Sequence, residues 1–99
     1  MTEMPIVCNL DAIPADKRER HHTLAAGIFA AVTAAEVLED GYAFRLPFSM
    51  WADLGEWAAL ERLCCPFLTF EFKLLHDGAV RLALSGPPGT KELLRAEMG

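Results

Sequence analysis

The sequence E-R-L-C-C-P-F, residues 61–67, marks the point where the chain changes from a helical pattern to a strand pattern. Upstream, over residues 50–65, apolar side chains recur at steps of three, four and seven, which predicts a helix with one core-facing side. Pro66 cannot continue this helix, and it biases Cys65 away from helical backbone angles. Downstream, residues 67–75 alternate between apolar and polar, which predicts a strand with one buried face. We therefore expect two adjacent thiols at a helix–strand junction.

Glu61 shares the helical face on which the two cysteines lie. It precedes Cys64 by three residues and Cys65 by four, and residues at these separations are neighbours on a helix surface. A carboxylate on an apolar face needs a hydrogen-bond donor or a proton, and His21 or Arg20 of the first predicted helix can supply the donor. The negative end of the helix dipole and Glu61 both disfavour a thiolate, so the pattern argues against a freely ionised nucleophile. A metal ion has enough charge to deprotonate the pair nonetheless.

The chain contains three cysteines, which is an odd number without the spacing of a secreted disulfide framework. A bond between the adjacent Cys64 and Cys65 would need a strained ring and is not expected. Cys8 belongs to a predicted first strand, on the face that points toward the core, and can approach the cysteine pair. We therefore expect the thiols to be free or metal-bound in a reducing cytoplasm.

Composition excludes several classes of protein. The 99 residues, expected to form a single domain over 1–99, are 53% hydrophobic and 23% charged, which is typical of a chain with a packed core. The net charge of −5 argues against binding to nucleic acid or to an anionic membrane. The sequence shows neither a signal-peptide pattern nor an apolar stretch of the ~18–20 residues that cross a bilayer. Residues 86–91, G-P-P-G-T-K, lack the glycine that precedes the lysine of a phosphate-binding loop, so nucleotide binding is not expected.

The remaining patterns predict an α+β fold. The first helix begins at Pro14, and its apolar stripe runs through Leu24, Ile28, Val32 and Ala35, with His21 pointing inward on the same face. A last helix is predicted over residues 90–98. Strands are predicted over residues 6–10, 36–39, 42–47, 67–75 and 79–85, with a turn at Asp40-Gly41. The expected order is β-α-β-β-α-β-β-α, a two-layer sandwich in which an antiparallel sheet of four to five strands, its later strands a meander, carries the helices on one face.

Four segments together resemble small uncharacterised bacterial proteins that share an E-R-x-C-C-P-F motif. They are Arg20-His21-x-x-Leu24, residues 40–45, residues 61–67 and residues 86–93. The resemblance extends over nearly the full chain and implies a free-standing domain. It implies no activity, cofactor or partner.

Three functional hypotheses follow from the residues. The first is a small cytosolic protein that binds a soft metal or metalloid, such as Cu(I), Zn(II) or Hg(II). In this hypothesis Cys64 and Cys65 are thiolate ligands, Cys8 or His21 is a third ligand, and Glu61 binds the ion or orients a ligand. The second is a non-catalytic structural or interaction module whose cysteines only pack in the core. The third is a thiol-redox protein.

No residue is assigned a catalytic role, and the sequence favours a protein that is not an enzyme. Trp51, Trp57 and six phenylalanines provide much apolar surface for so small a body. A homodimer that buries part of this surface is therefore also expected.

Overall fold

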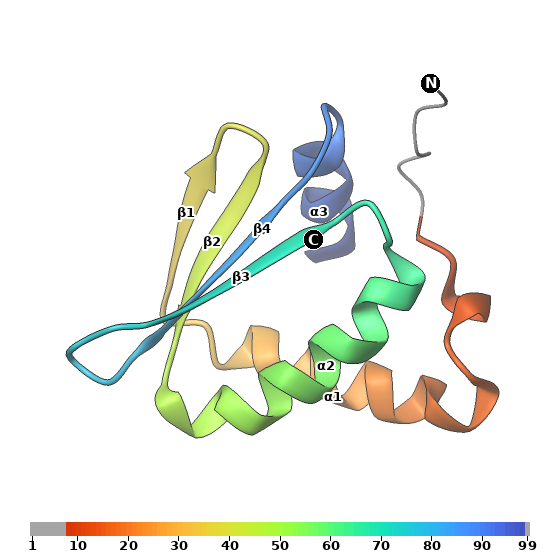
Figure 1. The fold of residues 1–99 in the computed structure, drawn as a ribbon, viewed down its shortest axis with the longest axis horizontal. Coiled ribbons are helices and arrows are strands. Elements are labelled where there is room, and N and C mark those ends of the chain that lie inside the picture. The colour runs from red at the N-terminus through yellow and green to blue at the C-terminus, as the bar shows by residue number, and fades with distance from the viewer. Residues whose placement is uncertain (1–7, 99) are drawn as a thin grey trace.

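Within residues 8–98, which this computed structural model describes, three helices cover one side of a four-stranded antiparallel sheet (Figure 1). The elements in chain order are α1 (Arg18–Ala30), β1 (Ala34–Leu38), β2 (Gly41–Leu46), α2 (Trp51–Cys64), β3 (Thr69–Leu74), β4 (Val80–Ser85) and α3 (Thr90–Met98). Short 3₁₀ turns occupy Leu10–Ala12, Ala15–Lys17 and Phe48–Met50. The predicted α+β fold, with an antiparallel sheet and helices on one face, is confirmed.

The order of the strands across the sheet is β1-β2-β4-β3. The expected meander is wrong at one step, because β4 lies between β2 and β3 and pairs antiparallel with both. Side chains of β2 and β4 are mostly buried, whereas those of β1 and β3 are mostly exposed. The two more completely buried strands therefore take the centre of the sheet, and the two strands that meet solvent form its edges.

Three predictions for the first half of the chain are wrong. The strand expected over residues 6–10 does not form at residues 8–10, where the chain enters the 3₁₀ turn that begins at Leu10, and residues 6 and 7 lie outside the described residues. The helical stripe expected to reach Ala35 stops earlier, because α1 ends at Ala30. The β-branched pair Val32-Thr33 favours extended backbone. The amide of Thr33 already donates to the carbonyl of Arg45 at 2.9 Å, so β1 starts at residue 34 and not at 36.

Aromatic rings connect the helices to the sheet. Phe29 of α1 makes edge-to-face contacts with Phe44 of β2 and with Trp57 of α2, at centroid distances of 5.6 and 6.0 Å. Trp57 in turn contacts Phe70 of β3 at 5.7 Å. Such contacts add stability beyond the area that they bury. They hold α1 and α2 side by side under the sheet, which positions the C-terminal end of α2.

Gly41 was predicted as the second residue of the Asp40-Gly41 turn, but the structure places it at the start of β2 and gives a different reason for a glycine there. Its φ angle is not positive, so the turn itself does not require it. A Cβ atom at this position would lie 1.8 Å from the carbonyl oxygen of Leu84 on the neighbouring strand. The absence of a side chain therefore allows β2 to start against the backbone of β4.

Candidate metal centre

The end of α2 carries three of the five candidate ligands, Glu61, Cys64 and Cys65, in the arrangement that the sequence predicted. Cys64 is the last residue of the helix, and Cys65 leaves it with φ −124° and ψ 71°. Pro66 explains this departure, since a residue that precedes proline avoids helical angles. The amide of Cys65 still donates to the carbonyl of Glu61 at 2.8 Å, so the carboxylate and both cysteines stay within one turn.

The segment before α1 brings the third cysteine to this place. The amide of Asn9 donates to the carbonyl of Cys64 at 2.8 Å, which satisfies a carbonyl left without a partner at the helix end. This contact places Cys8 beside Cys65, and the two form a disulfide with a Cα–Cα distance of 4.7 Å. The predicted approach of Cys8 is confirmed. The expectation that every cysteine is free or metal-bound is wrong for Cys8 and Cys65, and Cys64 is the free thiol among the described residues.

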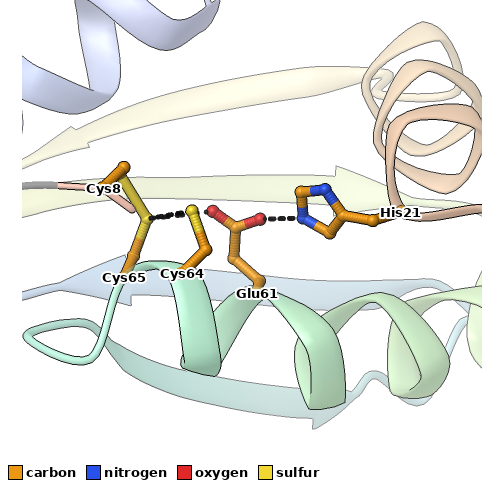
Figure 2. Close-up of a disulfide and its surroundings, with 5 residues drawn as sticks. All are labelled: Cys8, His21, Glu61, Cys64 and Cys65. Atoms are coloured by element: carbon orange, nitrogen blue, oxygen red, sulfur yellow. Dashed lines mark hydrogen bonds and ion pairs between the residues drawn. A yellow bond between two sulfur atoms is a disulfide. The ribbon is translucent and has the colours of Figure 1, made fainter. Parts of the chain in front are cut away.

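A continuous row of polar contacts runs from the sulfurs to α1 (Figure 2). The Sγ atom of Cys64 lies 3.6 Å from that of Cys65, which lies 3.2 Å from Oε1 of Glu61. The other carboxylate oxygen, Oε2, lies 2.5 Å from Nε2 of His21. Glu61 therefore faces the sulfurs with one oxygen and the imidazole with the other. When the carboxylate is ionised, Nε2 of His21 carries the proton and donates it to this hydrogen bond.

The row is sheltered from water. Cys64 and Cys65 are fully buried, and the side chains of His21 and Glu61 are only 10% and 15% exposed. The prediction that His21 points inward toward Glu61 is confirmed. A pair of this kind, once buried, is costly to break because it leaves one polar group unpaired.

Arg20, the other donor considered for Glu61, lies elsewhere. Its guanidinium forms a two-pronged ion pair with Glu56 one turn earlier on α2, at 2.8 and 2.9 Å. This contact lowers the pKa of Glu56, chiefly through the hydrogen bond from Arg20. Neighbouring positions on α1 therefore have different roles, since Arg20 forms a surface ion pair and His21 contacts the carboxylate beside the sulfurs.

Cys64 is a protonated thiol at neutral pH in the absence of a metal. Burial, and next the negative charge of Glu61, raise its pKa to about 11, although the nearby backbone amide of Asn9 acts in the opposite direction. A thiolate is the reactive form of cysteine, so this environment disfavours nucleophilic chemistry at Cys64. The position of this thiol at a helix C-terminus beside Glu61 predicted the same from the sequence.

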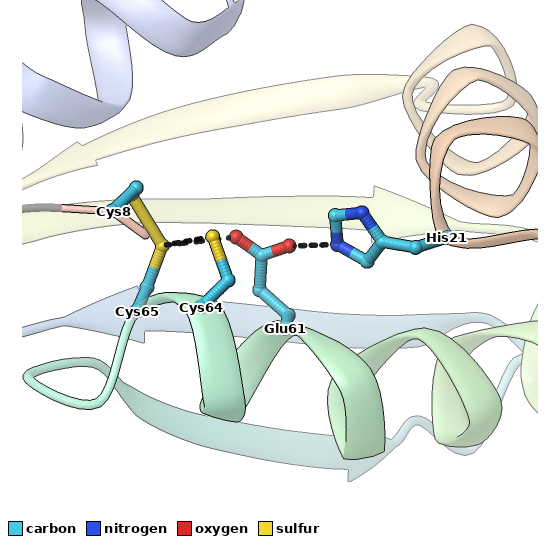
Figure 3. Close-up of polar contacts among 5 residues, drawn as sticks. All are labelled: Cys8, His21, Glu61, Cys64 and Cys65. Carbon is cyan, nitrogen blue, oxygen red and sulfur yellow. Dashed lines mark hydrogen bonds and ion pairs between the residues drawn. A yellow bond between two sulfur atoms is a disulfide. The ribbon is translucent and has the colours of Figure 1, made fainter. Parts of the chain in front are cut away.

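Four side chains offer ligand atoms that all lie within 4.8 Å of one another. They are Cys8, Glu61, Cys64 and Cys65, and Figure 3 shows the sulfurs and the carboxylate oxygen grouped at the end of α2. The structure thus brings four of the five predicted site residues together. His21 lies on the far side of the carboxylate from the sulfurs, and its role as a direct ligand stays a prediction. The sequence did not indicate the contact of Asn9 with the helix end, because that contact joins segments far apart in the chain.

Comparison of the chain with protein-family models, with curated proteins and with solved structures found no match. The resemblance to small bacterial proteins with the E-R-x-C-C-P-F motif therefore stays an expectation. None of the helices in residues 8–98 has the length and apolar character that a membrane crossing needs.

Proposed function

We propose that the reduced protein binds one soft metal ion through the thiolates of Cys8, Cys64 and Cys65, with the carboxylate of Glu61 as the fourth ligand. The observation that carries the proposal is the convergence of these four ligand atoms within 4.8 Å of one another. Three sulfurs favour ions such as Zn(II), Cu(I) or Hg(II) over hard cations, which prefer oxygen ligands.

The distances suit a tetrahedral ion. For metal–sulfur bonds of about 2.3 Å, two sulfurs on a tetrahedron lie about 3.8 Å apart. The sulfurs of Cys64 and Cys65 are 3.6 Å apart, and the sulfur of Cys65 is 3.2 Å from Oε1 of Glu61. The sulfurs of Cys8 and Cys65 are joined as a disulfide, so this bond must be reduced before both sulfurs can bind the ion. Reduction of that bond and a small displacement of Cys8 therefore complete the ligand set.

His21 acts on the ion through Glu61. Its hydrogen bond to Oε2 orients the carboxylate so that Oε1 faces the sulfurs. Partners of ligating side chains hold the ligand in position and raise affinity. His21 is thus a positioning residue in this proposal.

The disulfide makes metal binding depend on redox state. When the thiols of Cys8 and Cys65 are oxidised, two electrons and two protons pass to an oxidant such as a small-molecule disulfide, and the sulfur–sulfur bond forms. The oxidised protein keeps only Cys64 and Glu61 of the four ligands, too few to hold the ion. We therefore expect metal uptake by the reduced protein alone.

Titration of the reduced protein under anaerobic conditions tests the proposal. Zn(II), Cu(I) and Hg(II) are each added in competition with a chromophoric chelator, and one ion is expected per chain. The Cys64→Ser/Cys65→Ser variant should bind at least about 100-fold more weakly, since it lacks two of the ligands. Binding as tight as that of the unmodified protein would refute the proposal and would favour a module whose cysteines only pack in the core.

A second comparison decides whether Glu61 is a ligand. Glu61→Gln keeps the size of the side chain but removes its charge, and Glu56→Gln is the matched control on an exposed face of the same helix. For four-coordinate Zn(II), only the change at Glu61 should weaken binding. For Hg(II) or Cu(I) bound by three sulfurs, neither change should matter greatly. If both variants changed the affinity for Zn(II) equally, Glu61 would not be a ligand.

Thiol–disulfide exchange is a second candidate function, because Cys64 lies 3.6 Å from a disulfide sulfur. The high pKa of Cys64 opposes it, since exchange needs a thiolate. Glu61→Gln separates the two functions. This variant lacks the carboxylate ligand, so its affinity for Zn(II) should fall, whereas it keeps all three cysteines and should retain any exchange that begins at Cys64.

A further inference from the structure

Two residues of β3 and two from the segment where α2 begins form a cluster of exposed apolar side chains beside the outer edge of β3, which we call the β3 edge patch. It consists of Phe48, Trp51, Phe72 and Leu74, which are 55%, 40%, 36% and 56% exposed. Trp51 packs edge-to-face on Phe72 at 5.9 Å, and Phe48 stacks on Trp51 at 6.4 Å. Exposed aromatic side chains that pack on one another are typical of interaction surfaces.

The backbone of β3 is also free to pair. β3 is an edge strand with β4 on one side only, and no described segment of the chain pairs with its other side (Figure 1). The amide of Leu75, just beyond the strand, donates toward Ala79 in the turn to β4. Because amides alternate in direction along a strand, those of Phe70, Phe72 and Leu74 point away from β4. An exposed apolar edge of this kind is a template for another strand.

Two opposite charges flank the centre of this edge. Glu71 and Lys73 lie on either side of Phe72, on the face of the sheet that the helices leave open. Both are exposed, and neither takes part in an ion pair among residues 8–98. In the sheet, Lys73 lies opposite Arg81, a like charge.

We propose that a second copy of this chain pairs antiparallel with β3 about a twofold axis at Phe72, forming a continuous eight-stranded sheet from two four-stranded ones. In this register Glu71 lies opposite the partner's Lys73, and Lys73 lies opposite the partner's Glu71. The same axis places Phe72 against its own copy and Phe70 opposite the partner's Leu74, with Trp51 covering the rings.

The charges select this register over its neighbours. An axis at Glu71 would place two carboxylates opposite each other, and an axis at Lys73 would do the same with two ammonium groups. Like charges directly opposite across two strands are destabilising, whereas opposite charges stabilise. Only the axis at Phe72 places opposite charges across from each other. It also has at its centre a residue whose amide points away from β4 and is free to bond with the second copy. This interface contains none of the cysteines, so its formation does not depend on whether the site binds a metal.

Charge reversal tests the interface by sedimentation velocity over a range of protein concentrations. Glu71→Lys and Lys73→Glu each place like charges opposite each other at two symmetric positions. Each should weaken the homodimer at least about tenfold. An equimolar mixture of the two variants should associate again, because each variant then faces the opposite charge on the other. The double variant Glu71→Lys/Lys73→Glu should also form a dimer, and Glu39→Lys, the same change in the exposed turn after β1, should have no effect.

Several results would overturn the proposal. One is that the unmodified protein sediments as a monomer at every concentration. Another is association that survives Glu71→Lys, which would move the interface to a different face such as the β1 edge. A mixture of the two single variants that stays monomeric would show that the charges do not face each other. Circular dichroism of each variant verifies that a loss of association is not a loss of fold.

Discussion

The Cys8–Cys65 disulfide joins residues 57 positions apart, so reducing it should change stability by an amount that can be worked out. Closing a loop of this length removes conformational entropy from the unfolded chain, which is worth about 4 kcal/mol at room temperature in the chain-entropy model. For a chain of 99 residues, 1 kcal/mol corresponds to about 5 °C in Tm. We therefore expect reduction to lower Tm by about 20 °C in the absence of metal.

Metal binding to the reduced protein should recover part of this loss. At a free metal concentration of 100 times Kd, the gain is about 2.7 kcal/mol, or about 13 °C. Calorimetry or thermal circular dichroism measures Tm in three states, namely oxidised, reduced, and reduced with Zn(II). The expected order is oxidised highest, reduced with metal intermediate, and reduced without metal lowest.

Two single variants separate the disulfide from the metal site. Cys8→Ser lacks both, so its Tm should respond neither to reduction nor appreciably to Zn(II). Cys64→Ala keeps the disulfide and lacks one ligand, so its Tm should still fall on reduction but recover much less on metal addition. An unmodified protein with the same Tm in the oxidised and reduced states would refute the loop-closure argument. A Cys64→Ala variant that recovered as fully as the unmodified protein would refute the ligand set.

Other expected outcomes test individual residues. His21→Ala removes the donor that orients the carboxylate, so chelator competition should show metal affinity about 10- to 100-fold lower, whereas His22→Ala on the exposed side of α1 should leave it unchanged. Gly41→Ala forces a methyl group to within 1.8 Å of a carbonyl oxygen and should cost about 3 kcal/mol in urea unfolding. Gly27→Ala meets no atom within 4 Å and should stabilise α1 by up to about 1 kcal/mol, so a loss of stability there would contradict the reasoning. The Cys64 thiol ionises near 9.0 when unfolded and only at about 11 when folded. Between these pH values the unfolded state binds fewer protons, so the free energy of unfolding should fall as pH rises, and it should fall less in Cys64→Ala.

Local patterns predicted most of the elements and part of the site. The stripe over residues 50–65 corresponds to α2, and the alternation on either side of Gly78 corresponds to β3 and β4. Helical spacing alone was sufficient to place Glu61 beside the cysteines and His21 on the core-facing side of the first helix, with His21 and Arg20 both considered as donors to Glu61. These features depend on residues three or four positions apart on a helix, or on alternation along a strand, so a single stretch of sequence contains the information.

The sequence patterns gave a wrong helix end and a wrong strand order, because both depend on which distant segments pair with each other. The end of α1 moved back to Ala30, because Thr33 pairs with β2 rather than with the preceding turn. The position of β4 between β2 and β3 depended on which strands bury most of their side chains under the helices. The β-branched pair Val32-Thr33 favours the early end of α1 locally, but the partner with which each segment pairs is determined by residues far away in the chain.

The sequence by itself determined that this chain has an acid and two thiols on one face at the end of a helix, because side-chain spacing on a helix is a local property. The tertiary structure alone decided that Cys8 reaches them, since its position depends on the bond from Asn9 to the carbonyl of Cys64, more than fifty residues away along the chain. It also decided that Arg20 pairs with Glu56 and leaves His21 to Glu61, because only the packing of α1 against α2 determines which side chains meet. The third sulfur, and with it the candidate metal centre, is therefore a product of the fold.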